Sequence, residues 1–196
     1  MPYDELSTTL SIRVLDADWT GVNVVGVFGA ASGLLGLPGF YMVQAQRLGF
    51  GGLVAFLVTL LGSALLLGPM LWDTVIWLPL ARHDPSILDF TGPIYSSAAF
   101  VPFFVSAGLL WAAGYASLAW KTSRAAILPR VPCWLVAVGA PLFGLGSLLG
   151  TAQAIPRSNG ITLFSIGLVW IGFAMRRLPE VLQETPGPSP TVTEGC

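Results

Sequence analysis

The chain has 196 residues, of which 54% are hydrophobic and 10% are charged, and its mean hydropathy is +0.75. Soluble domains carry about 25% charged residues because a surface that faces water needs them. The 9 basic and 10 acidic residues are too few to solvate a globule of 20.7 kDa. These figures exclude a soluble domain, a disordered chain and a nucleic-acid-binding domain with a basic face, and they predict a polytopic membrane protein.

The charged residues cluster, and long uncharged stretches separate the clusters. A helix needs about 20 apolar residues to cross a hydrocarbon core of about 30 Å. Runs such as Leu53–Leu61 (LVAFLVTLL) lack the alternation of barrel strands, so we expect an all-α transmembrane bundle of about five spans over 19–178. The expected spans are 20–42, 50–72, 96–120, 132–152 and 159–177.

The distribution of Lys and Arg predicts the orientation. With five spans, one side receives Arg47, Lys121, Arg124, Arg130, Arg176 and Arg177, and the other receives only Arg13, Arg82 and Arg157. By the positive-inside rule the N-terminus is expected outside and the C-terminus in the cytoplasm, with the chain integral to the cytoplasmic membrane. The cationic loop 121–131 is expected to contact membrane lipids through their anionic headgroups.

Both terminal segments are expected to lie outside the bundle. Residues 1–18, the extracytoplasmic segment, lack the basic start and apolar core of a secretory signal, so the first span is expected to act as an uncleaved signal. Residues 179–196 are rich in Pro, Ser, Thr and Glu, which predicts a flexible cytoplasmic tail.

Glycines recur along one face of the first expected span. The spacing of Gly26, Gly29, Gly33 and Gly36 is three, four and three residues, which aligns them on a helix. In lipid, such a face permits close van der Waals approach of a neighbour. Three occupants stay open: another helix of the same chain, a partner subunit, or a flat apolar cofactor such as a carotenoid.

Asp73 is the one charge placed where it would be costly. A helix that starts near Phe50 has crossed about 30 Å by residue 70, which places Asp73 at the outer interface with Trp72 and Trp77 in the aromatic belt. The segment 72–80 would then turn along the interface with Trp72, Ile76 and Leu80 on its buried side. The alternative is a half-buried acid in an aromatic pocket, able to donate a proton or bind a cationic group.

Metal and redox chemistry have little support in the sequence. His83 is the only histidine, so it cannot build a zinc site or a two-histidine haem site, and no metal site is expected. It is expected to be a solvated loop histidine beside its charged neighbours, and the alternatives are ligation of one chlorophyll-type magnesium or proton exchange with Asp84. Cys133 and Cys196 form no CxxC pair.

One stretch supports a resemblance. Residues 72–88 (WDTVIWLPLARHDPSIL), followed by 123–130 (SRAAILPR) and a glycine-rich span, resemble uncharacterised small multi-span bacterial membrane proteins without an assigned activity. The resemblance covers about 50–177. It implies a prokaryotic origin and transfers no functional residue.

Two functions of different class remain. The first is an accessory or structural subunit that packs into a larger membrane complex or a homo-oligomer through the glycine face, in contact with lipid or an apolar pigment and not with nucleic acid. The second is a small intramembrane enzyme or carrier for a lipid or terpenoid. There Asp73 would be the general acid, the pocket walls would be Trp72, Trp77 and Trp111, and His83 or Asp89 would assist from the outer mouth.

Overall fold

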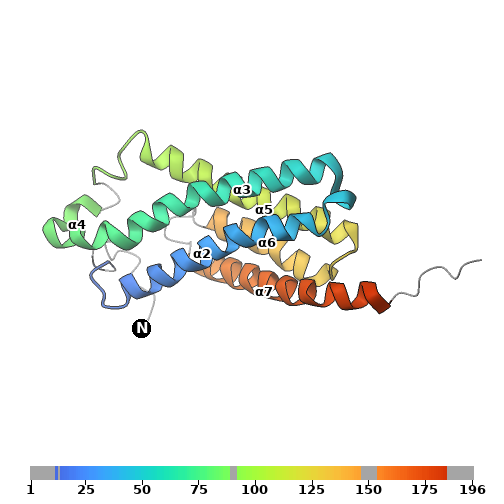
Figure 1. The fold of residues 1–196 in the computed structure, drawn as a ribbon. Coiled ribbons are helices and arrows are strands. Elements are labelled where there is room, and N and C mark those ends of the chain that lie inside the picture. Colours follow the sequence, from blue (N-terminus) through green and yellow to red (C-terminus); the bar gives the residue numbers. More distant parts are fainter. Residues whose placement is uncertain (1–11, 13, 89–91, 147–153, 185–196) are drawn as a thin grey trace, which may run out of the picture.

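Six α-helices and one short 3₁₀ helix build the structure, a computed structural model that describes residues 12, 14–88, 92–146 and 154–184. Within those ranges the chain contains no strand, which confirms the all-α bundle (Figure 1). The elements are α2 (Trp19–Met42), α3 (Ala45–Val75), α4 (Trp77–His83), η1 (Pro85–Leu88), α5 (Phe100–Ala125), α6 (Arg130–Gly146) and α7 (Ala154–Glu184).

Four described helices are long and apolar enough to cross a membrane, and α6 is a shorter apolar helix. The helix bounds differ from the expected spans mainly at their ends. Gly49 has φ 59° and ψ −164°, so a short turn over 45–48 precedes the long part of α3, which starts at the predicted Phe50. At the other end of the chain, α7 continues to Glu184, into the segment expected to be a tail; residues 185–196 lie outside the described ranges.

Glycines set the close approach of α3 to α5. A Cβ added at Gly114 of α5 would lie 2.6 Å from the Cα of Thr59, and a Cβ at Gly62 of α3 would collide with the backbone of Trp111. Thr59 satisfies its own hydroxyl by donating to the carbonyl of Ala55 at 2.6 Å. The two backbones therefore meet at positions where no side chain larger than hydrogen fits.

The pair α6 and α7 is held in the same way. A Cβ at Gly139 would lie 2.5 Å from the backbone nitrogen of Phe164, and one at Gly160 would collide with the backbone of Phe143. These two contacts fix an antiparallel register.

Aromatic rings fill the centre of the bundle between α5, α6 and α7. The ring of Trp111 lies 5.1 Å from that of Tyr115, 5.5 Å from that of Phe143 and 4.8 Å from that of Phe164. Trp111 is only 9% exposed. This residue is therefore a core residue of the bundle.

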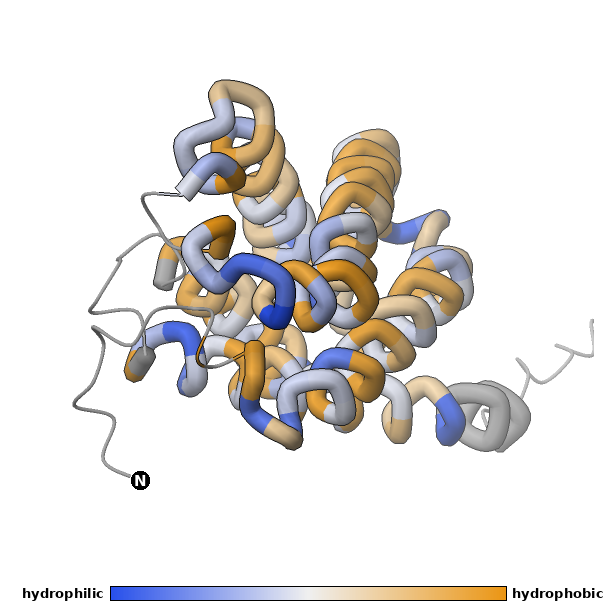
Figure 2. Tube along the Cα trace, turned by 90° about the vertical axis from the view of Figure 1, so that its left-hand side faces the viewer, coloured by the Kyte–Doolittle hydropathy of each residue, from blue (hydrophilic) through white to orange (hydrophobic). Residues whose placement is uncertain are grey.

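The helices also carry large hydrophobic side chains on their outer faces. Val25, Leu35, Phe50, Val169 and Phe173 are each at least 60% exposed, and the hydrophobic stretches run through all the long helices (Figure 2). Such exposure is costly in water and favourable in hydrocarbon, so the outer surface fits a membrane protein.

Helix α2 is the least enclosed of the long helices. It packs mainly against α3, and only 6% of its most apolar window is buried, against 22–33% for the other candidate spans. Near its C-terminal end, the ring of Tyr41 stacks on the ring of Phe56 of α3, with the two ring centroids 4.6 Å apart. The helix therefore stands partly apart from α5, α6 and α7.

Candidate functional site

One end of the bundle gathers polar and aromatic groups around Asp73. The indole Nε1 of Trp19, at the start of α2, donates a hydrogen bond to the backbone carbonyl of Asp73 at 3.0 Å. The Asp73 side chain is half-buried and lies within electrostatic range of Arg157 on α7 and of Tyr95 in the turn before α5. Asp73 therefore bonds to α2 through its backbone and lies within electrostatic range of α7 and of the turn before α5.

The aromatic part of this end centres on Trp77. Its ring, which is 6% exposed, stacks on Trp19 at 6.3 Å with planes 9° apart and meets Tyr95 edge-on at 6.4 Å. Burial raises the pKa of Tyr95 to about 12; the Asp73 charge adds to the rise and the Arg157 charge opposes it. The phenol is therefore a neutral hydrogen-bonding group beside the carboxylate at physiological pH.

The other residues predicted to act with Asp73 are not gathered there. Trp72 is 53% exposed, His83 is exposed at the end of α4, and Trp111 belongs to the central core. Asp89 lies outside the described residues. The expected walls of an aromatic pocket around Asp73 are thus reduced to Trp77, joined by Trp19 and Tyr95, which the sequence analysis did not single out.

The predicted buried side of segment 72–80 was wrong. Trp72 and Ile76 are 53% and 39% exposed, whereas Trp77 and Ala81 are 6% and 1% exposed. The buried face is the one that carries Trp77, because Trp77 stacks on Trp19 of α2 and meets Tyr95 edge-on.

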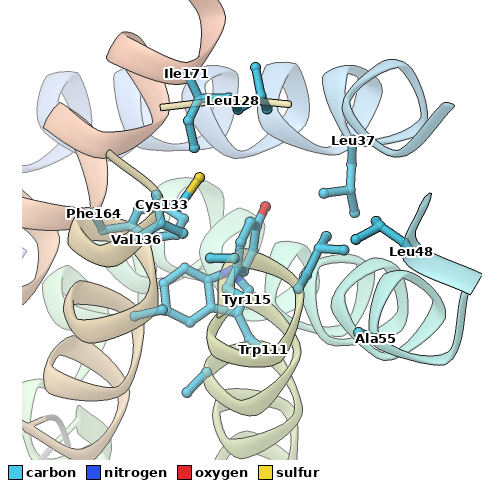
Figure 3. Packing of buried hydrophobic residues seen from close by; sticks show 14 residues of the cluster. Leu37, Leu48, Ala55, Trp111, Tyr115, Leu128, Cys133, Val136, Phe164 and Ile171 are labelled. Carbon is cyan, nitrogen blue, oxygen red and sulfur yellow. The ribbon is translucent and has the colours of Figure 1, made fainter. Parts of the chain in front are cut away.

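A pocket of about 460 Å³ opens near the opposite end, between α2 and the bundle of α5, α6 and α7. Its volume falls within the range of about 300–1,000 Å³ that ligand pockets occupy. The lining is almost wholly apolar and comes from all four helices: Gly33, Gly36, Leu37, Phe40, Tyr115, Leu118, Ala119, Val136, Leu168, Ile171, Gly172, Met175 and Arg176. Leu37, Tyr115, Val136 and Ile171 of this lining are labelled in Figure 3, among other residues of the hydrophobic core.

Glycines leave this pocket open. A Cβ added at Gly33 or Gly36 of α2, or at Gly172 of α7, would meet no atom within 4 Å. Of the four aligned glycines, only Gly26 contacts a neighbour, since its added Cβ would lie 3.4 Å from the terminal methyl of Met70. Gly29 is also open, but it lies outside the pocket. Packing within the chain therefore explains little of the glycine face.

The pocket and Asp73 are far apart. Trp19, which bonds to Asp73, precedes Gly33 by fourteen residues of α2, or about 21 Å of helix. The only ionisable groups on the pocket wall, among the residues that the structure describes, are Tyr115 and Arg176. The proton donor proposed from the sequence therefore has no access to the apolar pocket.

Only the α2 side of this pocket was predictable from the sequence, through the spacing of Gly33 and Gly36. Gly172 and Arg176 lie on α7 and belong to no regular spacing that would have marked them. Tyr115 has the sequence context of an ordinary core residue. Among the described residues, no group of three His, Cys, Asp or Glu side chains could hold a metal ion.

The fold and the apolar surface define a polytopic α-helical membrane protein. Comparison with protein-family models, curated proteins and solved structures finds no match to this chain. Its function is therefore argued from its own residues.

Proposed function

We propose that the chain is an accessory protein of the cytoplasmic membrane that holds an apolar molecule, the tail of a lipid or a pigment, between α2 and α7. One observation carries the proposal: the pocket of about 460 Å³ has apolar walls on four helices and is kept empty of side chains by Gly33, Gly36 and Gly172. An apolar chain that leaves the mobile lipid tails and packs against the pocket walls gains dispersion contacts. Such van der Waals packing is the main source of association in lipid.

Purification in mild detergent tests the proposal. The expected result is a co-purifying lipid or pigment, seen by mass spectrometry of an organic extract or by visible absorption respectively. Gly36→Leu should remove that molecule, because Gly36 lines the pocket and a Cβ added there meets no protein atom within 4 Å, so the leucine side chain would take up pocket space. Gly29→Leu is the matched control, since Gly29 lies on the same helix and is equally open but does not line this pocket. Equal retention by the two variants would contradict the proposal.

A second candidate is a partner helix seated on the glycine face of α2. Gly21, Gly29 and Gly39 are open beyond the pocket, so the face extends further than an occupant of the pocket would cover. A partner subunit or second copy would be lost from Gly29→Leu, whereas a pocket ligand would not. The same pair of variants therefore separates the two occupants, with the mass of the purified particle as the second measurement.

Catalysis by Asp73 is the less favoured role. The acid is separated from the pocket by about 21 Å of α2, and Trp72, His83 and Trp111 do not gather around it. Asp73→Asn should therefore leave retention of the bound molecule unchanged. Loss of the molecule, or accumulation of an unconverted lipid in cells that carry this variant, would favour the enzyme.

A further inference from the structure

The pocket is polar at only two points. Among the described residues that line it, Tyr115 and Arg176 carry the only oxygen and nitrogen atoms on side chains. Tyr115 is 6% exposed, and its hydroxyl points toward the space between Leu37 and Ile171 (Figure 3). Arg176 is exposed and lies one helical turn beyond Gly172 on α7. The pocket lining is therefore apolar apart from one buried hydroxyl and one exposed cation, Arg176.

Arg176 lies at the end of the bundle where other basic residues gather. Gly139 packs on Phe164 and Gly160 on Phe143, so continuing this antiparallel register places Arg130 level with Phe173, about one helical turn from Arg176. Lys121 lies at the same end, because its Nζ would be 2.7 Å from a Cβ at Gly51 near the start of α3. A long arginine side chain in this position keeps its guanidinium at the membrane boundary while its stem covers apolar surface.

We propose that the pocket binds a long-chain fatty acid, with the acyl chain against Gly33, Gly36 and Gly172 and the carboxylate on Arg176. The inference deepens the proposed function and rests on it. The guanidinium presents paired N–H donors that match the two oxygens of a carboxylate, and this pairing is stronger than a neutral hydrogen bond. The apolar wall accepts the chain but offers nothing to a polar headgroup other than this cation and the Tyr115 hydroxyl.

The test uses the full chain in nanodiscs of phosphatidylcholine, with a photoreactive palmitate as the probe. Labelled peptides are expected from 33–40 of α2 and 168–176 of α7, the two walls that face each other. Competition is then measured with palmitate, with lysophosphatidate as a different acidic amphiphile, and with hexadecanol, which has the same chain without the charge. Arg177→Gln is the control for Arg176→Gln, because Arg177 is adjacent and exposed but does not line this pocket.

We expect Arg176→Gln to weaken displacement by palmitate about tenfold or more and to leave hexadecanol unchanged, because only the charge-assisted bond is lost. Arg177→Gln should change the displacement of the probe by palmitate and by hexadecanol by no more than about twofold, as expected for an exposed surface charge. Equal effects of the two substitutions, or stronger displacement by lysophosphatidate than by palmitate, would overturn the fatty-acid assignment. If neither hexadecanol nor palmitate displaces the probe, or if Gly36→Leu is labelled like the parent chain, the proposed function itself fails.

Discussion

Trp19 and Asp73 connect the first residue of α2 to the end of α3, through an indole N–H that donates to the Asp73 backbone carbonyl at 3.0 Å. The two residues are 54 positions apart in the sequence. Because α2 makes few other buried contacts, this hydrogen bond and the stack of Trp19 on Trp77 fix its N-terminal end.

Replacing the donor should loosen that end. Trp19→Phe keeps an aromatic ring but removes the N–H, and we expect a loss of about 0.5–1.5 kcal/mol in the free energy of unfolding. Asp73→Asn should leave the bond intact, because the acceptor is the main-chain carbonyl. Unfolding in detergent measures both, with Trp72→Phe as the control because Trp72 is 53% exposed. An equal loss in Trp19→Phe and Trp72→Phe would contradict the assignment.

The titration of Tyr95 reports on the same end of the bundle. Its pKa is raised from 10.0 to about 12, first by burial and then by the Asp73 charge. The neutral phenol is thus favoured by the fold, so its contribution to stability is complete below pH 10 and is lost as the pH rises through about 12. Asp73→Asn should lower this pKa, and Arg157→Gln should raise it.

The tyrosinate absorbance in the ultraviolet measures that titration, after subtraction of the curve for Tyr95→Phe. Shifts of the opposite sign in the two variants would show that these charges do not act on Tyr95 in the way the geometry implies. An unperturbed titration near pH 10 would show that the ring is not buried.

Two glycines should respond in opposite ways to the same substitution. Gly114→Ala places a methyl group 2.6 Å from the backbone of Thr59, and overpacking of this kind costs about 1–3 kcal/mol. Gly36→Ala meets no atom within 4 Å, so its effect should stay within about 0.5 kcal/mol. Thermal unfolding of the purified variants in one detergent compares them. Equal destabilisation would mean that α2 packs more closely than described.

The orientation is testable through the two cysteines. Cys133 is buried in the bundle, so a membrane-impermeant maleimide should report on Cys196 alone. The positive-inside rule predicts no labelling in intact cells and full labelling after permeabilisation. Labelling of intact cells, absent from Cys196→Ser, would place the C-terminus outside and reverse the predicted topology.

The helices were largely predictable because charge is so costly in hydrocarbon that its spacing marks the spans. The break at Ile76 has a cause in the sequence: Pro79 lacks the N–H that would bond to the carbonyl of Val75, four residues earlier, although the apolar pattern of α3 runs on into α4. The packing of the helices was only partly predictable from the sequence. Gly62 and Gly114 belong to no regular spacing in the sequence, although they make close helix contacts, whereas most of the regularly spaced glycine face of α2 is open.

The candidate site divides in the same way. The α2 wall of the pocket was indicated by Gly33 and Gly36 because their spacing is regular. The opposite wall depends on which helix lies across the gap, a tertiary fact that residues such as Gly172 and Arg176 do not encode locally. Asp73 was noticed for its charge, yet its hydrogen-bonded contact with Trp19 is made by its backbone, which any residue would supply.

The weak enclosure of α2 affects how a molecule bound in the pocket exchanges with the membrane. Three walls belong to α5, α6 and α7, in which α6 packs extensively against both α5 and α7. The fourth belongs to a helix that packs mainly on α3. Moving α2 aside would expose the pocket sideways to the bilayer while the other three helices keep their packing. The rate at which a bound molecule exchanges with the membrane is then governed by how firmly α2 is docked, and its residence time should shorten when the Trp19 anchor is removed.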